Sequence, residues 1–118
     1  MPPTPPVAAV SNTVKVFAEG YIKSISPSRF KGLLRNEHGS YLVAGIFGNS
    51  VPTFHSVRAV FSSTRADGLV GTKPIEGKIG PAYFKLMTGD GSSEISGPLD
   101  MPIDPTTTVC GAITFSHA

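Results

Sequence analysis

The chain has 118 residues and a formal net charge of +2; 40% of its residues are hydrophobic and 15% are charged. This length supports one hydrophobic core, and this composition excludes a disordered chain. The 13 glycines and 11 prolines are spread along the sequence, which excludes a long apolar membrane span and disfavours long helices.

The start of the chain predicts an extended arm followed by one domain. It lacks the basic and apolar regions of a signal peptide, so we expect synthesis in the cytoplasm. Prolines fix the backbone torsion φ and lack an amide donor, and a run of them favours an extended geometry. We assign residues 1–12 to the arm and residues 13–118 to the domain. The arm residues expected to contact a partner are Pro2, Pro3, Pro5, Pro6 and Val7.

Residues 13–25 alternate apolar and polar side chains, which is the pattern of a half-buried strand. Gly20 lies where a bulge could bend this strand, as strands bend in small barrels. Residues 28–35 predict a loop or one helical turn, because Ser28 could cap a helix that Gly32 weakens. Residues 41–47 are apolar on both faces, so we expect a central strand that is covered on both sides.

Four further segments predict strands: residues 56–64, 74–79, 82–88 and 109–116. Cys110 lies in the last of these, in an apolar run where we expect a buried thiol. Residues 89–108 contain three prolines and three glycines, which predicts a long irregular loop. The apolar residues of this loop expected to contact a partner are Leu99, Met101 and Ile103.

The predicted elements indicate an all-β, single-domain fold with little or no helix. About six strands punctuated by glycine and proline are typical of an antiparallel β-sandwich or a small β-barrel. The sequence does not decide between these two. A long first strand with a central glycine also suits a five-stranded oligonucleotide-binding barrel, whereas the long late loop suits a sandwich.

Motifs for catalysis or metal binding do not occur in recognisable form. No serine lies in a G-x-S-x-G elbow, and His38, His55 and His117 are too far apart in sequence for a helical zinc pair. The single cysteine offers no C-x-x-C motif. We therefore expect no catalytic residues, no metal and no cofactor, and we expect that the protein is not an enzyme.

Charge is distributed unevenly along the chain. Residues 1–35 carry five basic side chains and only Glu19 as an acid, whereas residues 86–118 carry four acids and no lysine or arginine. This asymmetry suits complementary surfaces on neighbouring copies, or a basic nucleic-acid footprint. The residues of that footprint would be Lys23, Arg29, Phe30, Lys31 and Arg35.

These sequence features lead to two hypotheses about function, and the two belong to different classes. The first is a structural protein that forms homo-oligomers or larger assemblies through its arm and late loop, such as a viral coat, capsid-decoration or tail component located in the virion. The second is a module that binds single-stranded nucleic acid, with Phe30 and Tyr21 as stacking platforms. The small net charge weighs against the second, because affinity for nucleic acid depends on neutralising many phosphates.

Overall fold

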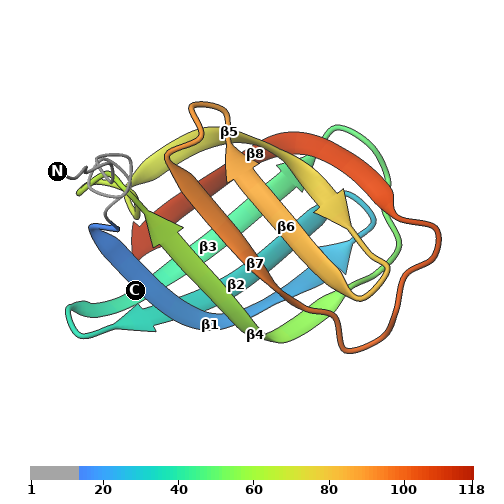
Figure 1. The fold of residues 1–118 in the computed structure, drawn as a ribbon, viewed down its shortest axis with the longest axis horizontal. Helices are drawn as coiled ribbons and strands as arrows, with labels where there is room; N and C mark the ends of the chain where they lie inside the picture. Colours follow the sequence, from blue (N-terminus) through green and yellow to red (C-terminus); the bar gives the residue numbers. More distant parts are fainter. Residues whose placement is uncertain (1–13) are drawn as a thin grey trace, which may run out of the picture.

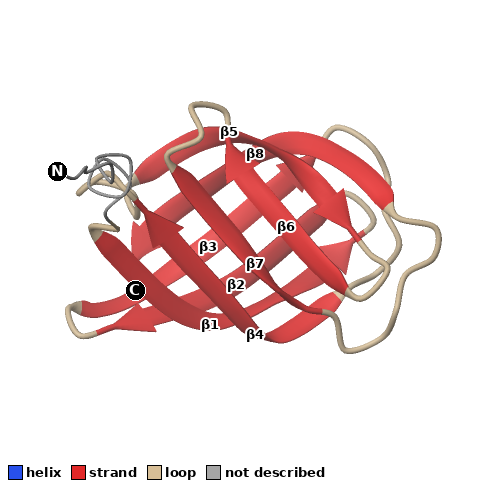
Figure 2. Cartoon of the chain, viewed as in Figure 1, coloured by secondary structure: helices blue, strands red, loops and turns tan. Residues whose placement is uncertain are grey.

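The computed structural model describes residues 14–118, which form a closed antiparallel barrel of eight strands (Figure 1). The all-β prediction is confirmed, and the barrel is the correct one of the two architectures. The described residues contain no helix (Figure 2), and therefore none that is long and apolar enough to cross a membrane. The strands are β1 (Val16–Ser26), β2 (Arg29–Asn36), β3 (Gly39–Phe47), β4 (His55–Ser63), β5 (Gly71–Ile79), β6 (Tyr83–Thr88), β7 (Ser93–Pro98) and β8 (Thr107–His117).

The barrel consists of two three-stranded meanders joined by two bridging strands. The order around it is β1-β2-β3-β8-β5-β6-β7-β4, and β4 pairs with β1 to close the ring. Strand β8 therefore joins β3 to β5, and β4 joins β7 to β1. This order and strand number differ from those of a five-stranded oligonucleotide-binding barrel.

Alternating side chains of all eight strands fill the interior. Phe30, Phe47, Phe54 and Phe84 form a chain of aromatic contacts with ring centroids 5.1–6.2 Å apart. Phe54 comes from the loop between β3 and β4, where Val51 is also buried, so this loop closes one end of the barrel. The interior of the barrel formed by the described residues is thus a packed core.

The bulge predicted at Gly20 lies at that position, although the extra residue belongs to β4. Gly20 pairs with Ala59 and Ile22 pairs with Ser56, so β4 has two residues where β1 has one. A Cβ atom on residue 20 would lie 1.8 Å from the carbonyl oxygen of Leu33, which shows how closely β1 and β2 approach there. The bulge and the close approach together bend β1 around the barrel.

The prediction of a loop or helical turn at residues 28–35 is wrong, because this segment forms β2. Phe30 and Leu34 point into the core, and the strand pairs with β1 on one side and β3 on the other. Gly32, interpreted as weakening a helix, instead allows a close strand approach: a Cβ there would lie 2.2 Å from the carbonyl oxygen of Tyr21. Long-range strand pairing determines the conformation of this segment, and local helix propensity does not.

The prediction of a long irregular loop at residues 89–108 is also wrong for the first half of this segment. Strand β7 lies within it and pairs with β4 and β6, placing Ile95 in the core. The small inward residues Ser93 and Gly97 hid its two-residue period from sequence reasoning. Residues 89–92 form the turn between β6 and β7, and the part from Leu99 to β8 is irregular. The backbone of this irregular part is fixed to the barrel by bonds from Leu99 N to Ala82 O and from Ile103 N to Pro81 O.

Strand β3 shows a further departure from expectation. Its inward residues Val43 and Phe47 are buried as predicted, but its outward residues Leu42 and Ile46 remain 49% and 47% exposed. The prediction that both faces of this strand are covered is therefore wrong for a single copy of the barrel. Cys110 is likewise exposed, because its position on β8 is an outward one between buried Val109 and partly buried Gly111.

Candidate binding surfaces

The exposed side chains of β3 belong to a larger apolar surface on the outside of the barrel. The register places Tyr21, Leu33 and Leu42 side by side on β1, β2 and β3. Ile46 of β3 lies opposite Ala112 of β8. We call this surface the outer apolar face; its residues are Tyr21, Leu33, Leu42, Ala44, Ile46 and Ala112. Outward positions of antiparallel strands are usually polar, so a contiguous apolar set of this kind is a candidate interaction surface.

A row of basic side chains borders the outer apolar face. Lys23 of β1 lies directly opposite Lys31 of β2, and Arg29 occupies the next outward position of β2. None of the three forms an ion pair within the described residues. We call these three residues the basic row. Like charges directly opposite one another destabilise a strand pair, so this arrangement favours a partner that brings negative charge.

The structure brings together only part of the predicted nucleic-acid footprint. Lys23, Arg29 and Lys31 share one surface, but Arg35 lies apart from them, opposite Glu19. Phe30 is 1% exposed and packs among the core phenylalanines, so it cannot stack on a base in this structure. Its alternation with Arg29 and Lys31 on one strand is the signal that it points inward.

The residues predicted to contact a partner from the late loop are divided by the structure. Ile103 is buried and Leu99 packs against the core, so both are used within the barrel. Met101 is 73% exposed and remains available to a partner. The predicted arm contacts, Pro2, Pro3, Pro5, Pro6 and Val7, lie outside the described residues.

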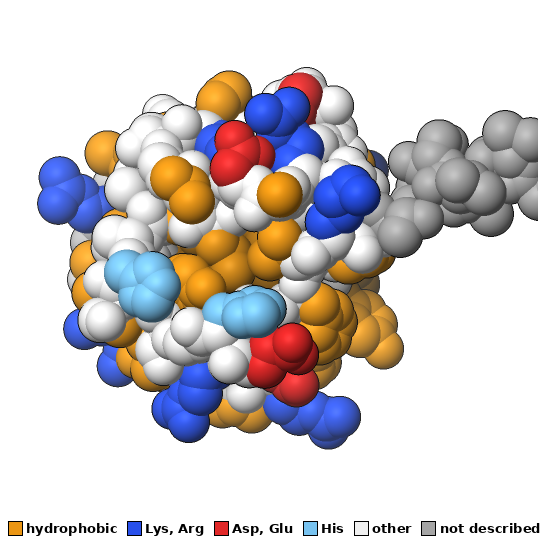
Figure 3. Space-filling view, turned by 90° about the vertical axis from the view of Figure 1, so that its left-hand side faces the viewer, with side chains coloured by type: hydrophobic (Ala, Val, Ile, Leu, Met, Phe, Trp, Pro, Cys, Tyr) orange, Lys and Arg blue, Asp and Glu red, His pale blue; other side chains and the backbone are white. Residues whose placement is uncertain are grey.

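The end of the barrel opposite Phe54 carries an open cleft of about 760 Å³. It lies between the start of β1, the β2–β3 turn, the β4–β5 loop and the end of β8. Figure 3 views this end, with hydrophobic side chains at its centre and two histidines beside them. We call it the mouth cleft. Sequence reasoning missed it, because its residues are far apart in the chain and only the fold brings them together.

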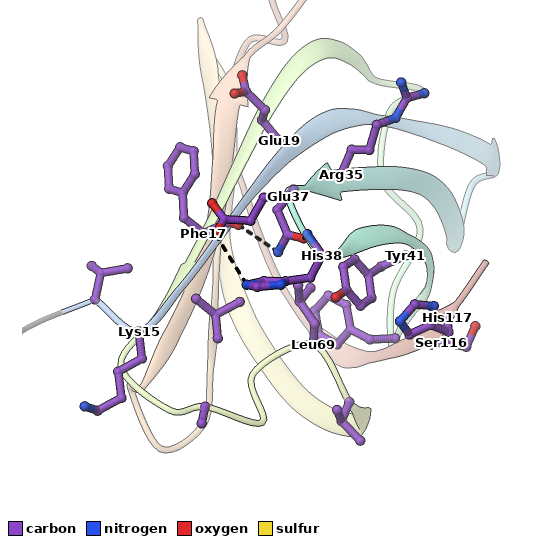
Figure 4. A pocket seen from close by; sticks show the side chains of 16 residues that line it. Lys15, Phe17, Glu19, Arg35, Glu37, His38, Tyr41, Leu69, Ser116 and His117 are labelled. Atoms are coloured by element: carbon purple, nitrogen blue, oxygen red, sulfur yellow. Dashed lines mark hydrogen bonds and ion pairs between the residues drawn. The ribbon is translucent and has the colours of Figure 1, made fainter.

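Aromatic and imidazole side chains form one wall of the mouth cleft. Tyr41 and His117 lie in contact with ring centroids 4.8 Å apart (Figure 4). His38 lines the cleft from the β2–β3 turn, where its Nε2 is 3.6 Å from a carboxylate oxygen of Glu37. Buried Leu69 and Phe115 contribute the apolar floor.

Charges at the rim of the mouth cleft balance one another. Lys15 and Arg35 supply two positive charges, and Glu19 and Glu37 supply two negative ones. Arg35 lies opposite Glu19 in the β1–β2 register, and Glu37 is close to His38. The cleft therefore offers an apolar, aromatic surface with no excess of either charge, which suits an uncharged ligand.

The described residues contain no group of three or more histidine, cysteine, aspartate or glutamate side chains that could hold a metal ion. One polar turn stands out for its electrostatics. The carboxylate of Asp90 accepts hydrogen bonds from the backbone N–H and hydroxyl of Ser92 and from the hydroxyl of Thr88. These bonds lower the pKa of Asp90 to about 2, and the bond from the Ser92 backbone N–H has the largest effect. They order the β6–β7 turn and indicate a structural role.

No family model, no curated protein and no solved structure matches the chain.

Proposed function

We propose that the protein is a non-catalytic structural subunit that self-associates through the outer apolar face. The observation that carries this proposal is strand β3, whose outward side chains are apolar and half exposed in a single copy. Small subunits of coats and other large assemblies complete their burial in this way. The partner on this face is a second copy of the chain, because two copies of one closed barrel can join isologously through the same face.

The energetics of covering β3 support self-association. Full burial of a leucine or isoleucine side chain contributes about 1.5–3 kcal/mol. Leu42 and Ile46 are each about half exposed, so covering both contributes on the order of 2 kcal/mol, before the rest of the face is counted. A stable interface buries about 800 Å² on each partner, so neighbouring outward residues of β1, β2 and β8 must join them.

Sedimentation velocity over a wide concentration range tests this proposal. We expect the native chain to self-associate and Leu42→Lys to be monomeric with an unchanged thermal unfolding midpoint, since residue 42 points outward. Tyr83→Lys is the matched control: Tyr83 is an exposed residue on β6, outside the outer apolar face, and its replacement should leave association intact. A native chain that is monomeric at every concentration contradicts the proposal.

A second candidate function, binding of a single-stranded nucleic acid, is favoured by the basic row. Phosphates would relieve the repulsion between Lys23 and Lys31, and partly buried Tyr21 lies beside them on the barrel exterior. Titration of a labelled oligonucleotide at two salt concentrations tests it. Arg29→Ala with Lys31→Ala should lower the salt slope by about two units, whereas Lys78→Ala, on β5 and away from the basic row, should not change it. No binding at low salt excludes this candidate.

A further inference from the structure

The described barrel has one closed end and one open end. The loop between β3 and β4 covers the closed end, where Phe54 and Val51 are buried. The open end forms the mouth cleft, whose volume of about 760 Å³ falls within the range of about 300–1,000 Å³ that small-molecule sites occupy. Such sites also occur preferentially in the mouths of β-barrels. The position and the size of the cleft therefore suit a small organic ligand.

His117 is held in place at the wall of the mouth cleft. Its backbone pairs with Tyr41 in the β3–β8 register, and beyond it the backbone N–H of Ala118 donates to the carbonyl of Ser40 at 3.0 Å. Its ring contacts that of Tyr41, and its Cε1 lies 3.2 Å from the position that a Cβ on Gly39 would take. The imidazole is thus packed against both neighbours, and the wall is formed before any ligand arrives.

The polar groups of this wall have hydrogen-bonding capacity that the barrel does not use. Neither the hydroxyl of Tyr41 nor the imidazole of His117 forms a side-chain hydrogen bond within residues 14–118. A hydroxyl can both donate and accept, and a neutral imidazole has one donor and one acceptor nitrogen. Both groups therefore remain able to recognise polar atoms of a ligand.

The rim charges narrow the chemistry of that ligand. An apolar ligand would remove two positive and two negative side chains from water without replacing their hydrogen bonds, which is costly. A ligand with a net charge would meet a like-charged pair at the rim. A ligand rich in hydroxyl groups avoids both costs, because each hydroxyl can donate to a carboxylate and accept from an ammonium or guanidinium group.

We propose that the mouth cleft binds a neutral carbohydrate. One face of a sugar ring consists of C–H groups, and this face packs on Tyr41, His117 and the apolar floor, while the hydroxyls at its edge bond to the wall and the rim. The two rings of the wall are inclined by 58°, so they form no parallel slot for a flat aromatic ligand (Figure 4). This site is separate from the outer apolar face and goes beyond self-association.

An NMR titration of the full chain with neutral sugars tests this proposal. The probes are glucose, galactose, mannose and N-acetylglucosamine; tetrahydropyran-2-methanol, which has the same ring with a single hydroxyl, is the matched control. We expect at least one sugar to give saturable shifts at His38, Tyr41 and His117 with a Kd on the order of 1 mM, and the control compound to give none. No saturable shift with any of the sugars overturns the inference, and so does equally tight binding of the control compound.

Paired variants of the full chain locate the site. His117→Ala should weaken sugar binding about two- to tenfold, the value of one aromatic contact, whereas His55→Ala, outside the cleft, should not change it. Glu37→Gln should also weaken it, by removing a charged acceptor from the rim, whereas Glu76→Gln on β5 should not. Unchanged affinity in both cleft variants overturns the inference. Cleft resonances that respond to Val7→Asp and to no sugar would show that a protein segment occupies the cleft, and would overturn it as well.

Discussion

The ring of Phe30 lies directly over Gly45, its cross-strand partner on β3, so that a Cβ atom on residue 45 would lie 2.0 Å from the ring. The absence of a side chain at one position thus makes room for one of the largest fully buried side chains at the other. This pair packs the core beneath the outer apolar face.

Gly45→Ala should therefore destabilise the barrel. A methyl group overlapping the Phe30 ring forces the core to shift, at a cost of about 1–3 kcal/mol. Urea unfolding measures the change. Gly48→Ala is the control, since a Cβ there would meet its nearest atom at 3.7 Å, and that variant should unfold close to the native midpoint. Equal stability of both variants would contradict the close packing described.

Ser56→Ala should stabilise the protein by about 1 kcal/mol. The Ser56 hydroxyl is fully buried and forms no hydrogen bond with the described residues, so its removal relieves an unpaired polar group. Ser63→Ala should do the reverse, because Ser63 Oγ accepts hydrogen bonds from Ser93 Oγ at 2.7 Å and from Arg65 N at 3.0 Å. Chemical denaturation of both variants checks the opposite signs.

Asp90 should contribute a pH-dependent part of the stability. Its pKa falls from 3.8 to about 2 on folding, so its contribution is fully present above pH 4 and is lost as the pH falls towards 2. Asp90→Asn should be less stable than the native chain at neutral pH, and the difference should shrink between pH 4 and 2. A difference that stays constant across this range would show that the hydrogen bonds do not favour the charged carboxylate.

Lys31→Glu should raise the stability of the barrel and weaken the binding of a polyanion. A carboxylate opposite Lys23 converts a like-charge pair into an opposite-charge pair, which should raise stability by about 0.2–1 kcal/mol at low salt. The same change should weaken any binding of an oligonucleotide to the basic row. Thermal unfolding and an oligonucleotide titration on the same sample check both expectations. A loss of stability would mean that Lys31 has an attractive partner in solution.

Much of the fold could be predicted from the sequence, because most strands show a clear two-residue period. Strands β2 and β7 could not, since Gly32 and Gly97 occupy inward positions where a side chain normally reveals the period. Closure of the barrel depends on pairing between β4 and β1, which no local pattern encodes. The outer apolar face had a sequence signal in the two-faced apolar run at 41–47, but the mouth cleft had none, because it joins His38, Leu69 and His117 from distant segments.

The exposure of residue 42 in the assembled protein tests the central claim most directly. Leu42→Cys, made in a Cys110→Ser chain so that it carries the only thiol, can be labelled with a thiol reagent at increasing protein concentration. Tyr83→Cys in the same background is the control, because Tyr83 is exposed on β6, away from the outer apolar face. We predict that labelling at residue 42 slows as concentration rises while labelling at residue 83 does not. Equal, concentration-independent rates at both positions would contradict the claim that a second copy covers β3.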